Sequence, residues 1–235
     1  MEAKVSLREK IGYGFGDAAS SMFWKIFTFY LAIFYTDVFG LPAAAVGTMF
    51  LLTRIWDTAN DPIMGVIGDR TQTRWGKFRP YLLWIAFPFG IMGVLLFTTP
   101  GVGMTGKLIY AYITYTLMMM IYTAINVPYA SLLGVMTADS NHRTSFASYR
   151  MIFAFGGSLL VVAIFQPLVD GFKKTFSEAL AYPLTMVVIG TLVIGFFLLT
   201  FAWTRERIRP PKSQKNSLKE DFKNLLGNVP WFILL

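Results

Sequence analysis

The residues most able to do chemistry in this sequence are ionisable side chains inside long apolar segments. In the stretch Arg54-Ile-Trp-Asp57-Thr-Ala-Asn60-Asp61, two carboxylates lie four residues apart, on one face of a helix. Carboxylate and amide oxygens suit a hard cation, and neighbouring carboxylates can share a proton. We therefore predict that Asp57, Asn60 and Asp61 hold a monovalent cation or a proton. The alternative is an Arg–Asp pair that only joins two helices.

A second polar face is formed by Asp17, Ser21 and Trp24, which recur at helical spacing in the first apolar segment. A carboxylate can hydrogen-bond the hydroxyl groups of a sugar, and an aromatic ring can stack on its C–H face. This face is therefore a candidate sugar site. The alternative is that Asp17 lies near the membrane interface and is solvated.

A third group lies in the fourth apolar segment, where Thr123 and Asn126 are three residues apart and Tyr122 and Asn126 are four apart. Thr123 can add a hydroxyl oxygen to a cation site on a facing helix, and Tyr122 and Asn126 can hydrogen-bond a sugar. The alternative for these residues is ordinary hydrogen bonding between membrane helices. Arg150, at the start of the fifth segment, is expected by default to extend toward lipid headgroups.

These residues need membrane-spanning helices to position them. The chain of 235 residues is 55% hydrophobic and 14% charged, whereas about a quarter of a soluble domain is charged. Spanning helices need about 20 mostly apolar residues. We predict an all-α membrane protein with six spans at residues 11–35, 42–67, 81–98, 107–136, 148–169 and 182–203.

Positive charge predicts the orientation of these spans. Fifteen of the 21 lysines and arginines fall in the segments 1–10, 68–80, 138–147 and 204–229. Such segments normally face the cytoplasm. We expect an inner (plasma) membrane protein in which both ends of the six-helix part are cytoplasmic.

The same pattern divides the chain into four parts. Residues 1–10 form the cytoplasmic N-terminus, 11–203 the bundle, 204–228 a cytoplasmic linker, and 229–235 the start of a truncated seventh helix. We expect a fragment, or a chain that is inactive without a partner half.

One cytoplasmic segment has a pattern beyond simple positive charge. Asp69, Arg70 and Arg74 lie between the second and third spans, and the acid is not needed for topology. An aspartate at a helix end beside arginines can hold two helix ends together in one conformation.

Several other classes of function are disfavoured. The chain has no cysteine for a disulfide or thiolate site, and no phosphate-binding loop of an ATP-driven pump. The basic residues follow membrane topology, so no nucleic-acid partner is expected. His142 is expected in a polar loop without metal-ligand partners, and no hydrolase-type residue set indicates an enzyme. No cofactor is expected beyond a coupling cation.

The sequence resembles the glycoside–pentoside–hexuronide cation symporter family, of the melibiose permease type. The resemblance covers essentially the whole chain. It rests most strongly on the motif from Arg54 to Gly65, and also on Arg74-Trp-Gly-Lys-Phe-Arg-Pro80 and on the stretch from Tyr122 to Leu132.

The resemblance implies a twelve-helix major-facilitator fold, of which this chain is the N-terminal half. It implies that Asp57, Asn60, Asp61 and Thr123 bind the coupling cation, Na⁺ or H⁺. It also implies that Arg150 contacts the sugar and that Tyr122 and Asn126 line the sugar site.

Three positions depart from the melibiose type. Asn126 and Ser21 stand where carboxylates grip the sugar, and Ala130 stands where an aromatic is expected. We expect a sugar or glycoside as substrate, with the C-terminal six-helix half and membrane lipid as partners. The alternatives are a lipid-carrying major-facilitator transporter, or a membrane scaffold or sensor that transports nothing.

Overall fold

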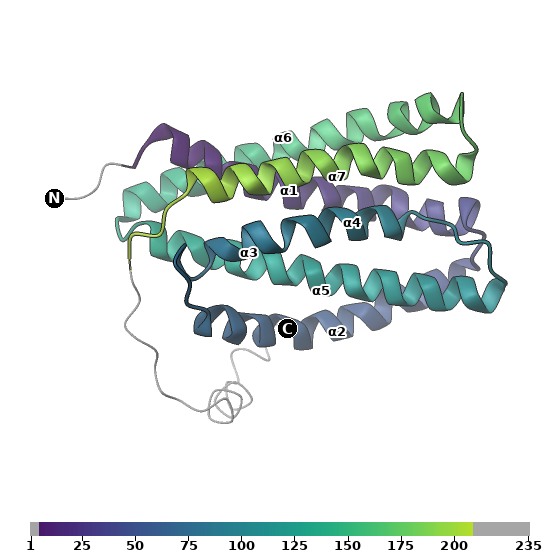
Figure 1. Cartoon of the computed structure of the whole chain (residues 1–235), viewed down its shortest axis with the longest axis horizontal. Helices are drawn as coiled ribbons and strands as arrows, with labels where there is room; N and C mark the ends of the chain where they lie inside the picture. Colours follow the sequence, from purple (N-terminus) through teal and green to yellow (C-terminus); the bar gives the residue numbers. More distant parts are fainter. Residues whose placement is uncertain (1–4, 209–235) are drawn as a thin grey trace.

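The computed structural model describes residues 5–208, whose regular structure consists of helices. Six helical rods lie side by side along the long axis of the molecule (Figure 1). The predicted all-α, six-rod architecture is confirmed. Most of the predicted linker, residues 209–228, and the predicted seventh-helix start, 229–235, lie outside the described residues.

The first rod begins at α1, Leu7–Ile26, four residues before the predicted start. Ser6 explains the difference. Its hydroxyl accepts the Glu9 amide N–H at 3.3 Å, and the Glu9 carboxylate accepts the Ser6 amide N–H at 3.3 Å. This reciprocal capping satisfies two amides that a helix start otherwise leaves without partners.

The rod then changes its winding. It continues as two π-helical segments, η1 (Phe27–Leu31) and η2 (Phe34–Val38). π-helical turns are rare and occur frequently at functional sites. The predicted first span, 11–35, is therefore one rod of mixed helix types.

The second rod is α2, Ala43–Arg70, which ends three residues beyond the predicted limit. The third rod is broken into α3, Arg79–Trp84, and α4, Ala86–Leu96. Pro88 explains the break, because a proline lacks an amide donor and its ring clashes with the carbonyl four residues earlier. The single helix predicted over 81–98 is therefore wrong at this point.

The remaining rods are α5 (Met104–Met136), α6 (Ser140–Lys173) and α7 (Glu178–Trp203). By length and composition alone, these are the three helices within residues 5–208 that can cross a membrane. The first rod changes helix type, the second carries several charges, and the third is split.

The start of α6 corrects one expectation. The helix begins eight residues before the predicted position, because the Asp139 carboxylate accepts the amide N–H groups of Asn141 and His142. These backbone hydrogen bonds lower the pKa of Asp139. His142 therefore lies in the first helical turn, with Nδ1 3.0 Å from Asp139 Oδ2, and not in a loop.

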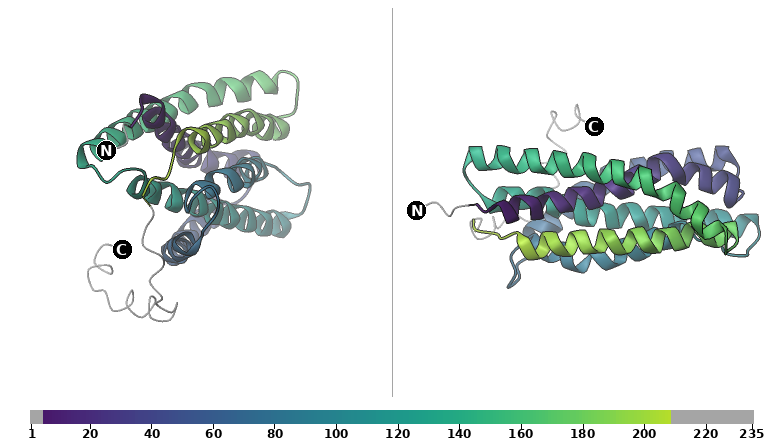
Figure 2. Two further views of the ribbon diagram at one scale, coloured as in Figure 1. Left: turned by 60° about the vertical axis from the view of Figure 1, so that its left-hand side comes forward. Right: turned by 90° about the horizontal axis from the view of Figure 1, so that it is seen from above.

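The rods are packed unevenly. α1 packs closely against α6 and α7, whereas α2 packs chiefly against α5. α2 and α6 lie on opposite sides of the bundle (Figure 1), and the views in Figure 2 agree. Only 22% of the most apolar stretch of α6 is buried, against 39% in α5 and α7.

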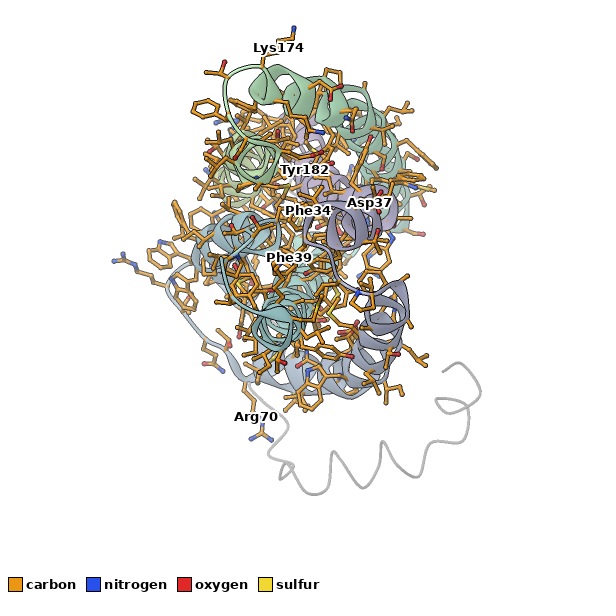
Figure 3. All side chains as sticks on the ribbon, turned by 90° about the vertical axis from the view of Figure 1, so that its right-hand side faces the viewer. Phe34, Asp37, Phe39, Arg70, Lys174 and Tyr182 are labelled. Carbon is orange, nitrogen blue, oxygen red and sulfur yellow. The ribbon has the colours of Figure 1, made fainter. Side chains whose placement is uncertain are left out.

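Aromatic side chains fill the end of the bundle away from the N-terminus. Phe34 and Phe39, from the end of the first rod, converge there with Tyr182 of α7 (Figure 3). The ring centroids of Phe34 and Tyr182 are 5.1 Å apart. These rings pack the interior of this end, while the charged residues there, such as Asp37 and Lys174, are exposed.

Candidate functional site

A hydrogen bond joins the two helices that carry the predicted cation ligands. Thr123 Oγ1 on α5 donates to Asp61 Oδ1 on α2 at 2.9 Å. Pro62 follows Asp61 inside α2, and because proline lacks an amide N–H, the carbonyl four residues before it loses its helical donor. Oxygen acceptors therefore gather at this level of the α2–α5 contact.

Asp57 lies one turn before Asp61 and is only partly satisfied. Its Oδ1 atom is buried and has no hydrogen-bond partner among residues 5–208. Asn60, between the two aspartates, is buried with 9% of its surface exposed. A buried acceptor without a donor is unfavourable, and a bound cation or proton relieves that cost. These residues therefore fit a small cation.

Arg54 connects this cluster to the first rod. Its guanidinium carbon lies 4.8 Å from the centroid of the Trp24 ring on α1. The Trp24 ring is in turn 5.6 Å from the ring of Tyr122 on α5. An Arg–Asp pair that only joins two helices therefore remains an alternative for Arg54. Its guanidinium, however, also stacks on Trp24, a residue of the predicted sugar site.

A second charged cluster joins α1 to α6. Arg150 Nε donates to Asp17 Oδ2 at 3.0 Å, and only 16% of the Asp17 side chain is exposed. The guanidinium also faces the Tyr129 ring at 5.7 Å. Arg150 is thus directed toward a carboxylate inside the bundle, which disfavours both the solvated Asp17 and the headgroup-directed Arg150.

The other predicted sugar-site residues are placed less decisively. Asn126 donates through Nδ2 to the Tyr122 carbonyl of its own helix at 2.9 Å. Ser21 is half-buried, one turn after Asp17 on α1. The structure therefore joins Arg150 to Asp17 and Trp24 to Tyr122, and it ties Asn126 to the backbone of Tyr122. Among residues 5–208, no side-chain hydrogen bond links Ser21 to this set.

The two clusters meet on α5. Tyr122 contacts Trp24 of α1, whereas the next residue, Thr123, contacts Asp61 of α2. Consecutive residues of a helix point about 100° apart. One short segment of α5 therefore faces both clusters.

The predicted conformational loop has a more local arrangement than expected. Asp69 Oδ1 lies 2.8 Å from Lys77 Nζ, and 70% of the Asp69 side chain is exposed. Arg74 stacks on the neighbouring Trp75 ring at 4.3 Å, and Arg70 projects from the surface (Figure 3). The bridging role of Asp69, Arg70 and Arg74 remains a prediction.

Sequence reasoning missed a cluster at the same end of the bundle. The Glu206 carboxylate, after α7, accepts the amide N–H groups of Lys77, Phe78 and Arg79 at 2.7–2.9 Å. It thereby caps the start of α3. The signal was an acid inside the basic run Arg205-Glu206-Arg207, at a position where topology needs only positive charge.

The next residue makes a similar tie to the first rod. Arg207 Nη2 donates to Glu9 Oε2 at 2.7 Å, and this hydrogen bond raises the pKa of Arg207. The amides of Arg207 and Ile208 both donate to the Val135 carbonyl at the end of α5. The first residues of the predicted linker therefore pack against the bundle.

Metal coordination of the usual kind does not describe the α2–α5 cluster. Across residues 5–208, no group of three or more histidine, cysteine, aspartate or glutamate side chains is placed to hold a metal ion. The cluster instead offers two carboxylates with amide and hydroxyl oxygens, which are the oxygen ligands that hard cations take.

Comparison with known proteins identifies the context of this geometry. A family model described as MFS/sugar transport protein matches residues 12–235. The chain is 43% identical over 232 residues to the inner membrane symporter YicJ of Escherichia coli K12, covering 98% of this chain and 50% of that protein. It is 44% identical over 231 residues to the putative glycoside/cation symporter YagG of the same strain, again covering 98% and 50%.

A third relative comes from a different bacterium. The isoprimeverose transporter of Lactiplantibacillus pentosus is 36% identical over 233 residues, which cover 98% of this chain and 49% of that protein. The chain thus spans about half the length of the curated relatives it matches. All three relatives are named as transport proteins, and none is named as an enzyme.

Proposed function

The chain belongs to the MFS/sugar transport protein family, and we propose that it forms one half of a cation-coupled symporter for a sugar or glycoside. In this proposal the α2–α5 cluster binds the coupling cation, and the cluster on α1, α5 and α6 binds the sugar. The observation that carries it is the Asp61–Thr123 hydrogen bond beside the unpartnered Asp57 oxygen.

Charge explains why the cation is needed. Two carboxylates one turn apart repel each other, and in a closing apolar cavity that repulsion is poorly screened. A bound Na⁺ or proton removes this repulsion, so closure over the sugar is favoured when the cation is bound and disfavoured when the sugar is bound without it. This is the physical requirement for symport by alternating access.

We assign sugar binding to the cluster on α1, α5 and α6. Asp17 and Arg150 offer an acceptor and donors for hydroxyl groups, and Trp24 and Tyr122 offer ring faces. Ser21 lies one turn after Asp17 on α1 and Asn126 lies one turn after Tyr122 on α5, and both are included in the proposed site. Since Tyr122 and Thr123 are adjacent, a cation that orders Thr123 also orders the sugar-facing side of α5.

A second six-helix half is the proposed partner. The sides of α2 and α6 expose large apolar residues, among them Leu52 and Ile55 on α2 and Ile152 and Phe155 on α6. The relatives continue for about as many residues again. We propose that such a half covers these faces and encloses the two clusters, in an inner membrane where we expect, from the charge bias, that both ends of this six-helix part face the cytoplasm.

The test is uptake of labelled glycosides by vesicles that contain this chain joined to the second half of YagG. Uptake is measured in Na⁺, in Li⁺, in choline, and across a proton gradient. Asp61→Asn is expected to reduce the stimulation by the coupling cation by about 5–150-fold, since coupling free energies are typically about 1–3 kcal/mol. Asp37→Asn is the matched control, because Asp37 is exposed at the other end of the bundle.

The outcomes separate the proposal from its rivals. Loss of cation stimulation in Asp61→Asn, with Asp37→Asn unchanged, supports the assigned site. Uptake that ignores Na⁺, Li⁺ and pH in every protein would sink the symport proposal. Absence of any uptake, with both halves folded, would favour the scaffold or sensor alternative.

A further inference from the structure

A basic pocket lies where the first and last rods end together. It has a volume of about 380 Å³ and is lined by Ser6, Arg8, Glu9, Trp203, Arg205 and Arg207. Ligand pockets typically fall in the range of about 300–1,000 Å³, so this one is large enough for a small polar group. α1 begins and α7 ends at the same end of the bundle (Figure 1).

The lining has an excess of positive charge. It carries three arginines against one glutamate, and that glutamate is committed to Arg207 at 2.7 Å. Arg8 and Arg205 are exposed, and neither forms an ion pair with a carboxylate in the part of the chain that the structure describes. Two guanidinium groups are therefore left for an anion.

The pocket walls are held in place by packing. Arg8 stacks over the Trp203 ring at 5.0 Å. A Cβ on Gly12 would lie 2.5 Å from the Trp203 Cβ, so glycine lets the end of α7 approach α1. The Arg207–Glu9 pair ties the chain after α7 back onto α1. The pocket is thus built by contacts between distant segments and is not a loose surface patch.

The position of the pocket indicates which kind of anion it binds. Trp203 is the last residue of α7, and tryptophan favours the membrane interface at the level of the headgroups. Leu7, next to Arg8, is 59% exposed, so an apolar contact lies beside the charges. Basic pockets between spanning helices bind anionic lipid headgroups. A free phosphate has no acyl chain to contact Leu7 and no preference for the membrane interface.

We propose that this pocket binds the phosphodiester of an anionic phospholipid, in the leaflet where the N-terminus lies. Arg8 and Arg205 bind the phosphate. Trp203 lies at the depth of the lipid glycerol group, and Leu7 contacts an acyl chain. Arg207 positions the site through Glu9. The inference requires only that the protein lies in a membrane, as its family indicates. It does not depend on the symport proposal.

The experiment is native mass spectrometry of the full 235-residue chain, titrated with phosphatidylglycerol or with phosphatidylcholine of the same acyl chains. The variant Arg8→Gln/Arg205→Gln is compared with Arg74→Gln/Arg143→Gln, which removes the same charge at the same end but outside the pocket lining. Each arginine near an anionic lipid accounts for roughly a fivefold effect on affinity, so the first variant should bind phosphatidylglycerol about 25-fold more weakly.

Further variants and a competitor sharpen the result. Arg8→Lys/Arg205→Lys keeps the charge and should retain most of the binding, and circular dichroism establishes that each variant keeps its helices. Equal affinity for the two lipids, or an equal loss in the two glutamine variants, overturns the proposal. Displacement of phosphatidylglycerol by millimolar inorganic phosphate also overturns it, because the site would then take free anions.

Discussion

The contact between α1 and α6 and the contact between α2 and α5 are built in opposite ways. The α1–α6 contact is tight, because a Cβ on Gly157 would lie 2.8 Å from the Ala18 carbonyl oxygen, and its Asp17 and Arg150 are paired. On α2, a Cβ on Gly68 would lie 3.7 Å from the Phe78 ring and 4.0 Å from Pro128 of α5, which are ordinary contact distances, and the buried Asp57 Oδ1 has no hydrogen-bond partner among residues 5–208.

This difference indicates which helix contact is rigid and which one can bind a ligand. Small residues let membrane helices approach closely and gain packing energy, and a paired charge needs no ligand. The Asp57 carboxylate, on the less tightly packed helix α2, has the opposite properties: it lacks a partner and can accept a ligand. We infer that the α1–α6 contact serves as the fixed frame and that α2 responds to the ion.

The largest expected effect comes from breaking the charged pair in the tight region. Arg150→Met leaves Asp17 without its cation, and should lower the free energy of unfolding by about 3 kcal/mol, the low end for buried pairs because Arg150 is partly exposed. Unfolding in mixed detergent micelles measures this. Arg143→Met, an exposed arginine outside this contact, should cost less than about 1 kcal/mol. Equal costs would show that the pair contributes no special stability.

The next effect tests the packing of the same region. A Cβ on Gly16 would overlap the ring of Tyr129, which is fully enclosed and donates its hydroxyl to the Tyr13 carbonyl at 2.7 Å. Gly16→Ala should therefore destabilise the protein by about 2 kcal/mol, as overpacked cores do. The control is Gly156→Ala on α6, where an added Cβ would meet no side chain of the described residues within 4 Å. A neutral Gly16→Ala would mean that the ring moves freely.

Sequence reasoning found the rods and most residues of both clusters, because apolar length and helical spacing are local properties. It missed the earlier start of α1 although Ser6 and Glu9 form a recognisable capping pair. The break at Ile85 was also readable from Pro88. The acid Glu206 stood out within its basic run, but its partners at the start of α3 could not be predicted, since they lie more than 120 positions away.

Pairing between charges was equally hard to foresee. The spacing in α2 placed Arg54 beside Asp57, but the fold also brings Arg54 over Trp24 and sets Arg150 against Asp17. Such partners depend on which faces of separate helices meet, and one sequence does not specify that. The ligand roles of both clusters remain proposals.

A smaller effect of opposite sign is expected in the loose region. Among residues 5–208, no atom outside the local helix backbone lies within 4 Å of a Cβ built on Gly65 of α2, so Gly65→Ala adds helix propensity without a clash. The protein should gain up to about 1 kcal/mol of stability. Together with Gly16→Ala, the same chemical change then has opposite signs in the two regions. Destabilisation by Gly65→Ala would contradict the loose packing, and the same micelle unfolding assay decides.

The smallest stability effect should come from the α2–α5 hydrogen bond. Thr123→Val removes the donor to Asp61 while keeping the shape, and such bonds between membrane helices contribute about 0.6 kcal/mol. Thr114→Val is the control, since Thr114 bonds carbonyls of its own helix α5. In a double-mutant cycle, Thr123→Val should couple to Asp61→Asn, whereas Thr114→Val should not. If Thr123→Val weakens cation stimulation far more than it weakens folding, the hydrogen bond belongs to the ion site; if both fall together, Thr123 only joins two helices.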